Sequence, residues 1–296
     1  MQITLERTTA EKLRPARPVG TASHIAVRLW GARGGIACPG PQTAKYGGNT
    51  ACVEVHFDDH LLIFDAGTGL RRLGEKLLAR GEAVKADIFF SHFHIDHVCG
   101  LPFFVPCYIP TSQLRIWGAS LPRGRTTKQA LSAMMVDPLF PVGLDEFKAK
   151  VEYRDFQPGE TLRPHADIVL RTLPLNHPGG CTGYRLEYGN KSIAYVTDTE
   201  HQPGILDKNV LELAEGADLL IYDANYTDEE FSRFIGWGHS TWQQGVRIAD
   251  AAHVETLLLF HHDPKHHDEM LDGIDREVKK IRPGTIVGRE DQEILV

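Results

Sequence analysis

Residues 91–97 read SHFHIDH, and this short stretch decides the fold. It places three histidines and one aspartate, His92, His94, Asp96 and His97, within six positions, directly after the apolar run ADIFF that is typical of a buried strand. Neutral imidazole and carboxylate are good ligands for zinc and similar divalent metals. Four such ligands are more than one tetrahedral site with an open position needs, so the stretch predicts two metal ions. The alternative is a polar loop, in which all four groups would need separate partners.

Outward from this stretch, short β-rich segments alternate with amphipathic helices. Strands are expected at 25–30, 51–57, 60–67, 86–92, 167–175, 182–188, 191–198, 218–224 and 254–260. Helices are expected at 69–81, 121–135, 204–217, 241–253 and 268–281. Ser240 is the expected N-cap of the helix that begins at Thr241. We predict an N-terminal extension over 1–23 and one layered α/β domain over 24–296, with two independent domains as the alternative.

Composition narrows the class of protein. The 296 residues carry 32 Lys and Arg against 39 Asp and Glu, a formal net charge of −7. This balance does not favour a broad basic surface for long nucleic acids. No apolar stretch approaches the roughly 18 residues of a membrane span, and the N-terminus does not look like a secretory signal. The five cysteines are scattered and lack C-x-x-C spacing, which predicts reduced thiols in a cytoplasmic protein, with one incidental disulfide as the alternative.

The order of the potential ligands along the chain resembles the metallo-β-lactamase superfamily. Asp65 ends an early strand before the 91–97 motif, and His177, Asp198 and His261 follow it, each after an expected strand. The resemblance runs from about residue 25 to the C-terminus. It implies a four-layer αββα sandwich with two divalent metal ions. Zinc is the expected metal, with manganese or iron as alternatives.

The resemblance also implies how the ligands divide. One metal takes His92, His94 and His177, and the other takes Asp96, His97 and His261. Asp198 bridges the two metals together with a hydroxide, and Asp65 supports the site from behind the ligands. With Asp96 and Asp198 counted among the catalytic groups, the implied reaction is hydrolysis by attack of the bridging hydroxide.

The other histidines are assigned by position. His261 and His262 compete as the final ligand; they point apart because a strand alternates its faces, and His261 is favoured as the first residue after the apolar run. His201 either lines the cleft or packs elsewhere. His266 and His267 are expected to be solvated residues at a helix entry. Surface positions are expected for His24, His56, His60, His165 and His253.

A second motif points to one branch of the superfamily. Residues 238–241 read GHST, which resembles the ribonuclease Z-like phosphodiesterases. In that branch the histidine matching His239 faces the scissile phosphate and acts as general acid, a task that suits imidazole because its pKa lies near neutrality. The alternative is that His239 only precedes an N-cap serine.

Two departures favour a small substrate. His177 and Asp198 are 21 positions apart, which leaves a strand pair and no room for a tRNA-gripping arm. The glycine-rich segments 30–35 and 38–50 are similar to those of smaller phosphodiesterases that act on cyclic nucleotides. Backbone amides there, with Arg33 and Asn49, are candidate phosphate contacts, although ordinary tight turns are the alternative. We therefore predict a phosphodiesterase for a small phosphodiester such as a cyclic nucleotide.

Other functions remain open at this point. A tRNA 3′-processing endonuclease is the first alternative, and a hydrolase of a lactone, thioester or β-lactam is the second, because the metal core alone does not choose the substrate. A binding module with a silent metal site is the alternative outside the enzymes. Homodimerisation is expected from the resemblance. Residues 121–150 are expected to be an insertion, either beside the site or at a subunit contact.

Overall fold

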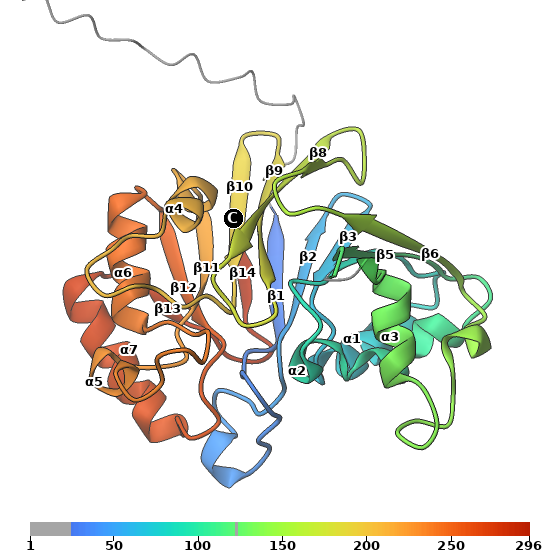
Figure 1. Ribbon diagram of the computed structural model, residues 1–296, viewed down its shortest axis with the longest axis horizontal. Helices are drawn as coiled ribbons and strands as arrows, with labels where there is room; N and C mark the ends of the chain where they lie inside the picture. Colours follow the sequence, from blue (N-terminus) through green and yellow to red (C-terminus); the bar gives the residue numbers. More distant parts are fainter. Residues whose placement is uncertain (1–24, 122–123) are drawn as a thin grey trace, which may run out of the picture.

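The computed structural model describes residues 25–121 and 124–296, so the expected extension 1–23 and His24 lie outside it. Within the described residues, two seven-stranded sheets pack face to face. Their strand orders are β14-β1-β2-β3-β4-β5-β6 and β13-β12-β11-β10-β9-β8-β7. Figure 1 shows α4, α6 and α7 along the left flank, α1 and α3 along the right, and the sheets between them.

The first sheet comprises β1 (Ala26–Gly31), β2 (Cys52–Phe57), β3 (His60–Phe64), β4 (Lys85–Phe89), β5 (Gln113–Ala119), β6 (Lys150–Phe156) and β14 (Glu293–Leu295). The second comprises β7 (Thr161–Leu162), β8 (Ile168–Leu175), β9 (Cys181–Tyr188), β10 (Lys191–Val196), β11 (Leu219–Asp223), β12 (Thr256–Phe260) and β13 (Ile286–Val287). The α-helices are α1 (Gly69–Leu78), α2 (Ile95–Val98), α3 (Thr127–Met134), α4 (Lys208–Ala214), α5 (Asp228–Phe231), α6 (Trp242–Ala251) and α7 (Asp268–Ile281).

Three apolar clusters hold these layers together. The central cluster lies between the sheets, where Phe64 contacts the rings of Phe89, Tyr184 and Tyr195. A second cluster joins the first sheet to α1, whose buried leucines recur at helical spacing: Leu70, Leu73 and Leu77. The third joins the second sheet to α4, α6 and α7. Each sheet is therefore buried on both faces, which confirms the four-layer αββα sandwich.

The strand directions bring the chemically important residues to one edge. β3 runs parallel to β4, and β10, β11 and β12 run parallel to one another. β8 and β10 both pair antiparallel with β9, so they also share a direction. The carboxyl ends of these strands therefore meet at the same edge, where α/β sheets form binding crevices.

Most of the expected helices and strands are confirmed, and the structure differs from the expectation in some further elements and in the N-cap of α6. Among the strands, β5, β6, β7, β13 and β14 were not expected from the sequence, and among the helices, neither were α2 and α5. Ser240 is not the N-cap of α6: Thr241 takes that position, and its Oγ1 accepts a hydrogen bond from the backbone N–H of Gln244 at 3.0 Å. The buried Ser240 hydroxyl instead bonds to His201 and Tyr222.

All five cysteines are free in the structure, as expected. Among the helices of the described residues, none has the length and apolar character needed to cross a membrane.

Candidate metal centre and active site

The site is built from residues that directly follow strand ends. Asp65 follows β3, Asp198 comes two residues after β10, and His261 follows β12. All three have positive φ angles, of 60°, 49° and 60°. Non-glycine residues rarely adopt this left-handed conformation, which costs roughly 1–3 kcal/mol and recurs at functional sites. The backbone turns sharply there and directs each side chain into the space between the two sheet edges.

The seven predicted ligands converge into two groups. One group is His92, His94 and His177, and the other is Asp96, His97 and His261; within each, the potential ligand atoms lie within 4.8 Å of one another. Asp198 stands between the groups.

The two carboxylate oxygens of Asp198 face opposite groups. Oδ1 lies 3.8 Å from Nε2 of both His92 and His177, whereas Oδ2 lies 3.2 Å from Nε2 of both His97 and His261. This is the arrangement expected of a carboxylate shared between two cations.

The donor set fits metal ions better than it fits a closed hydrogen-bond network. Nε2 of His92 is fully buried and has no hydrogen-bond partner among the described residues. Ring nitrogens face one another at 3.1 Å between His97 and His261, and at 3.0 Å between His94 and His177. A buried imidazole nitrogen without a partner is costly unless a ligand satisfies it.

The protonation states of most groups in the site favour binding of a cation. Burial alone would raise the pKa of Asp96 and of Asp198, but the adjacent histidines outweigh burial and hold both carboxyl pKa values far below their usual range. Burial lowers the pKa of His92, which keeps that imidazole neutral. Burial also acts against charge on His97, but the carboxylates of Asp198, Asp96 and Asp65 raise its pKa. Metal binding would therefore displace a proton from His97.

Asp65 holds His97 in place from behind. Its Oδ2 accepts hydrogen bonds from Nδ1 of His97 at 2.9 Å, from the Tyr195 hydroxyl at 2.7 Å and from the Ser91 hydroxyl at 2.8 Å. Its Oδ1 accepts from the Ser91 backbone N–H at 2.7 Å. Four donors on one fully buried carboxylate fix the tautomer of His97, so that its Nε2 is the atom that faces the site.

We expect Asp65→Asn to weaken metal binding by about 10- to 100-fold, the usual effect of losing a partner that orients a ligand. The amide NH₂ would face a donor, so His97 would lose its fixed orientation. Competition with a chromophoric chelator measures the affinity. Asp87→Asn is the matched control, because Asp87 is also a buried aspartate that accepts bonds from Trp117 and Arg115, away from the site. Equal loss of metal affinity in both variants would contradict this role for Asp65.

His239 lies beside the centre and is oriented by a residue not singled out from the sequence. Its Nδ1 is 3.0 Å from Oδ2 of the fully buried Asp223 and 3.7 Å from Oδ1 of Asp198. Burial would lower the pKa of His239, but the Asp223 carboxylate outweighs it and raises the pKa to about 9. The protonated form that a general acid requires is therefore favoured in the metal-free protein.

The remaining histidines separate clearly. His262 points away, with its Nε2 on the Gly288 carbonyl at 2.9 Å, so His261 is the member of the pair that reaches the centre. His201 packs against Phe231 and bonds to Ser240. The expectation that His266 is solvated is wrong. The His266 side chain is buried, and its ring bonds to Glu230.

The candidate phosphate contacts are engaged elsewhere. Arg33 is buried, and its guanidinium donates to the carbonyls of Gly47 at 2.7 Å and His266 at 2.7 Å. The Asn49 amide donates to Glu290 at 3.0 Å. Both side chains therefore brace the glycine-rich loops from inside, and within the Arg33 guanidinium only the buried Nη2 has no hydrogen-bond partner among the described residues. The loop reaches the site through its backbone instead: Gly35 N–H donates to Oδ2 of Asp96 at 2.7 Å.

Sequence reasoning missed several supporting residues. Asp223 carried a usable signal, since it ends the apolar strand β11 in the way that Asp65 follows β3. Asn225, which donates to the carbonyl of His261 at 2.9 Å, and Tyr195, inside β10, carried none. Their roles depend on contacts between segments far apart in the sequence.

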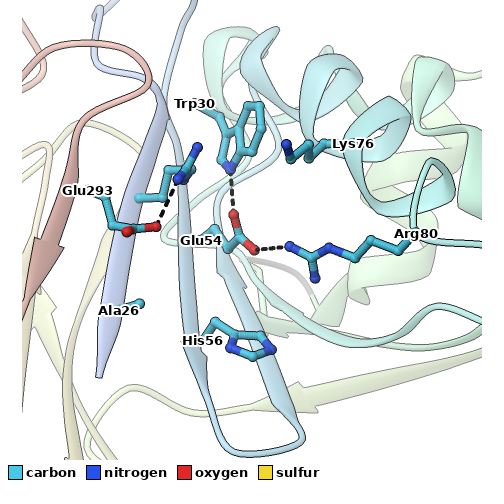
Figure 2. Close-up of a pocket in the computed structure, with 8 residues that line it drawn as sticks. Ala26, Trp30, Glu54, His56, Lys76, Arg80 and Glu293 are labelled. Carbon is cyan, nitrogen blue, oxygen red and sulfur yellow. Dashed lines mark hydrogen bonds and ion pairs between the residues drawn. The ribbon is translucent and has the colours of Figure 1, made fainter. Parts of the chain in front are cut away.

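A cleft of about 120 Å³ on the face of β1 and β2 is a different kind of feature. The Glu54 carboxylate accepts a hydrogen bond from the Trp30 indole at 2.8 Å and pairs with Arg80 at 3.7 Å (Figure 2). Arg28 pairs with Glu293 at 2.8 Å. These two ion pairs hold the β1 and β2 face against Glu293 and against the segment that follows α1, and His56 and Lys76 also line the cleft.

Comparison with known proteins agrees with this geometry. A family model described as a β-lactamase superfamily domain matches residues 60–262. The ribonuclease Z of Parabacteroides distasonis is 33% identical over 291 residues, which cover 82% of this chain and 91% of that protein. The ribonuclease Z of Haloarcula marismortui is 24% identical, with 82% and 89% covered.

Solved structures share the fold at lower identity. The metallo-β-lactamase fold protein YhfI from Bacillus subtilis has a TM-score of 0.70 at 21% identity, covering 92% of this chain and 99% of that one. A diphosphatase of the PhnP family gives 0.66 at 20%, covering 91% and 97%, and the short form of human tRNase Z gives 0.61 at 18%, covering 91% and 98%. On the family match and the Parabacteroides relative, the chain belongs to the metallo-β-lactamase superfamily, as a ribonuclease Z-like, metal-dependent hydrolase.

Proposed function

We propose that this hydrolase cleaves phosphodiester bonds, with His239 as the general acid. The observation that supports the proposal is the Asp223–His239 pair beside Asp198. Asp223 holds Nδ1 of the ring, which leaves Nε2 free to give a proton to the leaving oxygen. When bound, two divalent ions would supply an activated water and neutralise charge on the phosphoryl oxygens. His92, His94, His177, Asp96, His97, His261 and the shared Asp198 would hold them.

Among phosphodiesters, we propose the 3′ end of an RNA, as in tRNA processing, as the substrate. The relatives named ribonuclease Z, matched along most of their length, support it better than they support the cyclic nucleotide expected from the sequence. Zinc remains the proposed metal.

One feature keeps a small phosphodiester as the second candidate. β9 and β10, between His177 and Asp198, form a hairpin joined by only Gly189 and Asn190. This segment holds no arm that could grip RNA, so an RNA substrate must be held by other surfaces. A homodimer through 121–150 could supply such a surface and stays a proposal; Val136 and Leu139 are exposed there.

A single panel tests the proposal. Zinc-loaded protein is incubated with a pre-tRNA that carries a 3′ trailer, with 2′,3′- and 3′,5′-cyclic nucleotides, and with a lactone. Asp198→Ala is the blank that exposes contaminating nuclease. We expect cleavage of the pre-tRNA at a single 3′ position. Cleavage of cyclic nucleotides alone would favour the second candidate, and turnover of the lactone alone would overturn the phosphodiesterase proposal.

A further inference from the structure

The turn that precedes His239 exposes a large aromatic side chain beside the centre. Trp237 follows α5 and is 63% exposed, and its neighbour Ile235 is 61% exposed. Single exposed apolar residues are ordinary on protein surfaces. Three further observations set Trp237 apart.

The first is a continuous row of rings. Tyr226 lies edge-on to His239, with ring centroids 6.0 Å apart, and stacks on Phe234 at 4.4 Å with nearly parallel planes. Phe234 in turn meets the indole of Trp237 at 5.5 Å. The row therefore leads from the candidate proton donor, through buried and half-buried rings, to one exposed indole.

The second is the fixed backbone of the turn. Oε2 of Glu200 accepts hydrogen bonds from the backbone N–H groups of Gly236 at 2.7 Å and Gly238 at 2.8 Å. Nδ1 of His177 donates to the Gly238 carbonyl at 2.8 Å. Gly238 has a φ of 86°, and a Cβ there would lie 2.2 Å from Nδ1 of His177. The turn is therefore tied to a proposed metal ligand, and the backbone on both sides of Trp237 is held in place before any ligand arrives.

The third is a cation in the same turn. The guanidinium of Arg233 lies 5.8 Å from the centre of the Phe234 ring. A flat, pre-organised aromatic surface with a cation nearby matches a nucleotide, whose base stacks and whose phosphate is anionic. An aliphatic partner would gain nothing from the planarity of the indole.

We propose that Trp237 is a stacking platform for the nucleobase next to the scissile phosphate, with Arg233 beside it for a neighbouring phosphate. This inference rests on the proposed phosphodiesterase function and adds to it the residue that recognises the nucleobase beside the cut. Trp237 determines specificity through binding, and the proton chemistry remains with His239.

Titration of the zinc-loaded protein with AMP, with ribose 5-phosphate as the base-free control, tests the platform. We expect AMP to quench tryptophan fluorescence in the wild type and not in Trp237→Phe, because Trp30 and Trp242 are buried and Trp117 is half-buried. By calorimetry, Trp237→Ala should weaken AMP binding roughly 5- to 150-fold, the size of one base–aromatic stack. Trp237→Phe should lose less, and ribose 5-phosphate binding should not change.

Ile235→Ala is the matched control, since it removes an equally exposed apolar side chain from the same turn. Equal AMP affinity in Trp237→Ala and the wild type, an equal loss in Ile235→Ala, or no AMP binding at millimolar concentration would overturn the platform. Cleavage of RNA with bases or abasic residues beside the cut separates this inference from the proposed function. If Trp237→Ala loses AMP affinity while no RNA is cut, the platform stands and the RNA substrate fails. If the wild type and Trp237→Ala cut the RNA with a base beside the cut and the RNA with an abasic residue there at equal rates, the platform is wrong.

Discussion

Asp198→Ala is expected to lose both metal ions and to reduce kcat/KM by at least about 10³-fold, because charge stabilisation and water activation are lost together. The physical reason is the shared position of the carboxylate. Its two oxygens face different ligand groups, at 3.8 Å from His92 and 3.2 Å from His97. Without this carboxylate, several imidazoles surround the site and no negative charge lies between the two ligand groups. Two cations bound there would repel each other.

Elemental analysis of metal per chain and the rate on the best substrate of the panel measure the effect. Asp59→Ala is the control, because Asp59 is an exposed aspartate in the β2–β3 turn. Asp198→Asn keeps the shape of the side chain and removes its charge, so it shows whether any loss comes from misfolding. Full metal content and full rate in both Asp198 variants would disprove the bridging role.

The residues that converge at the candidate metal centre could be predicted from the sequence because they stand in local patterns. A polar residue that directly follows an apolar strand can be recognised in the sequence, as with the candidate ligand His261 and with Asp65, which holds His97. Even the choice between His261 and His262 followed from strand alternation, since the first residue after β12 reaches the site and the second turns to Gly288.

What failed depends on partners that sequence spacing does not reveal. Arg33 looked like a free cation in a glycine-rich loop, yet it is buried, and its Nε and Nη1 donate to carbonyls 14 and 233 positions away. His266 looked solvated, yet Glu230 from α5 covers it. The predicted N-cap, Ser240, was one residue before the observed cap, Thr241. Ser and Thr are both good N-caps, so the sequence does not choose between them. The choice depends on the buried partners of the Ser240 hydroxyl.

His239→Ala is expected to lower kcat by about 10²- to 10⁴-fold, the usual contribution of general acid catalysis, while both metals remain bound. The geometry makes this a demanding test. His239 lies within ligand distance of two sets, His177 with Asp198 and Asp223 with His261, so it could also be a metal ligand. A metal ligand and a proton donor predict different results for one substitution, and metal content separates them.

The leaving group separates the two roles again. A p-nitrophenolate leaving group departs from a diester without being protonated, whereas a ribose oxygen must receive a proton as it leaves. His239→Ala should therefore lose far more rate on RNA or a cyclic nucleotide than on bis-p-nitrophenyl phosphate, and Asp223→Asn should show a smaller loss with the same selectivity. His267→Ala, at an exposed histidine that begins α7, should match the wild type. An equal loss on both kinds of substrate, or loss of metal, would show that His239 supports the centre itself, because a proton donor affects only the bond that needs its proton.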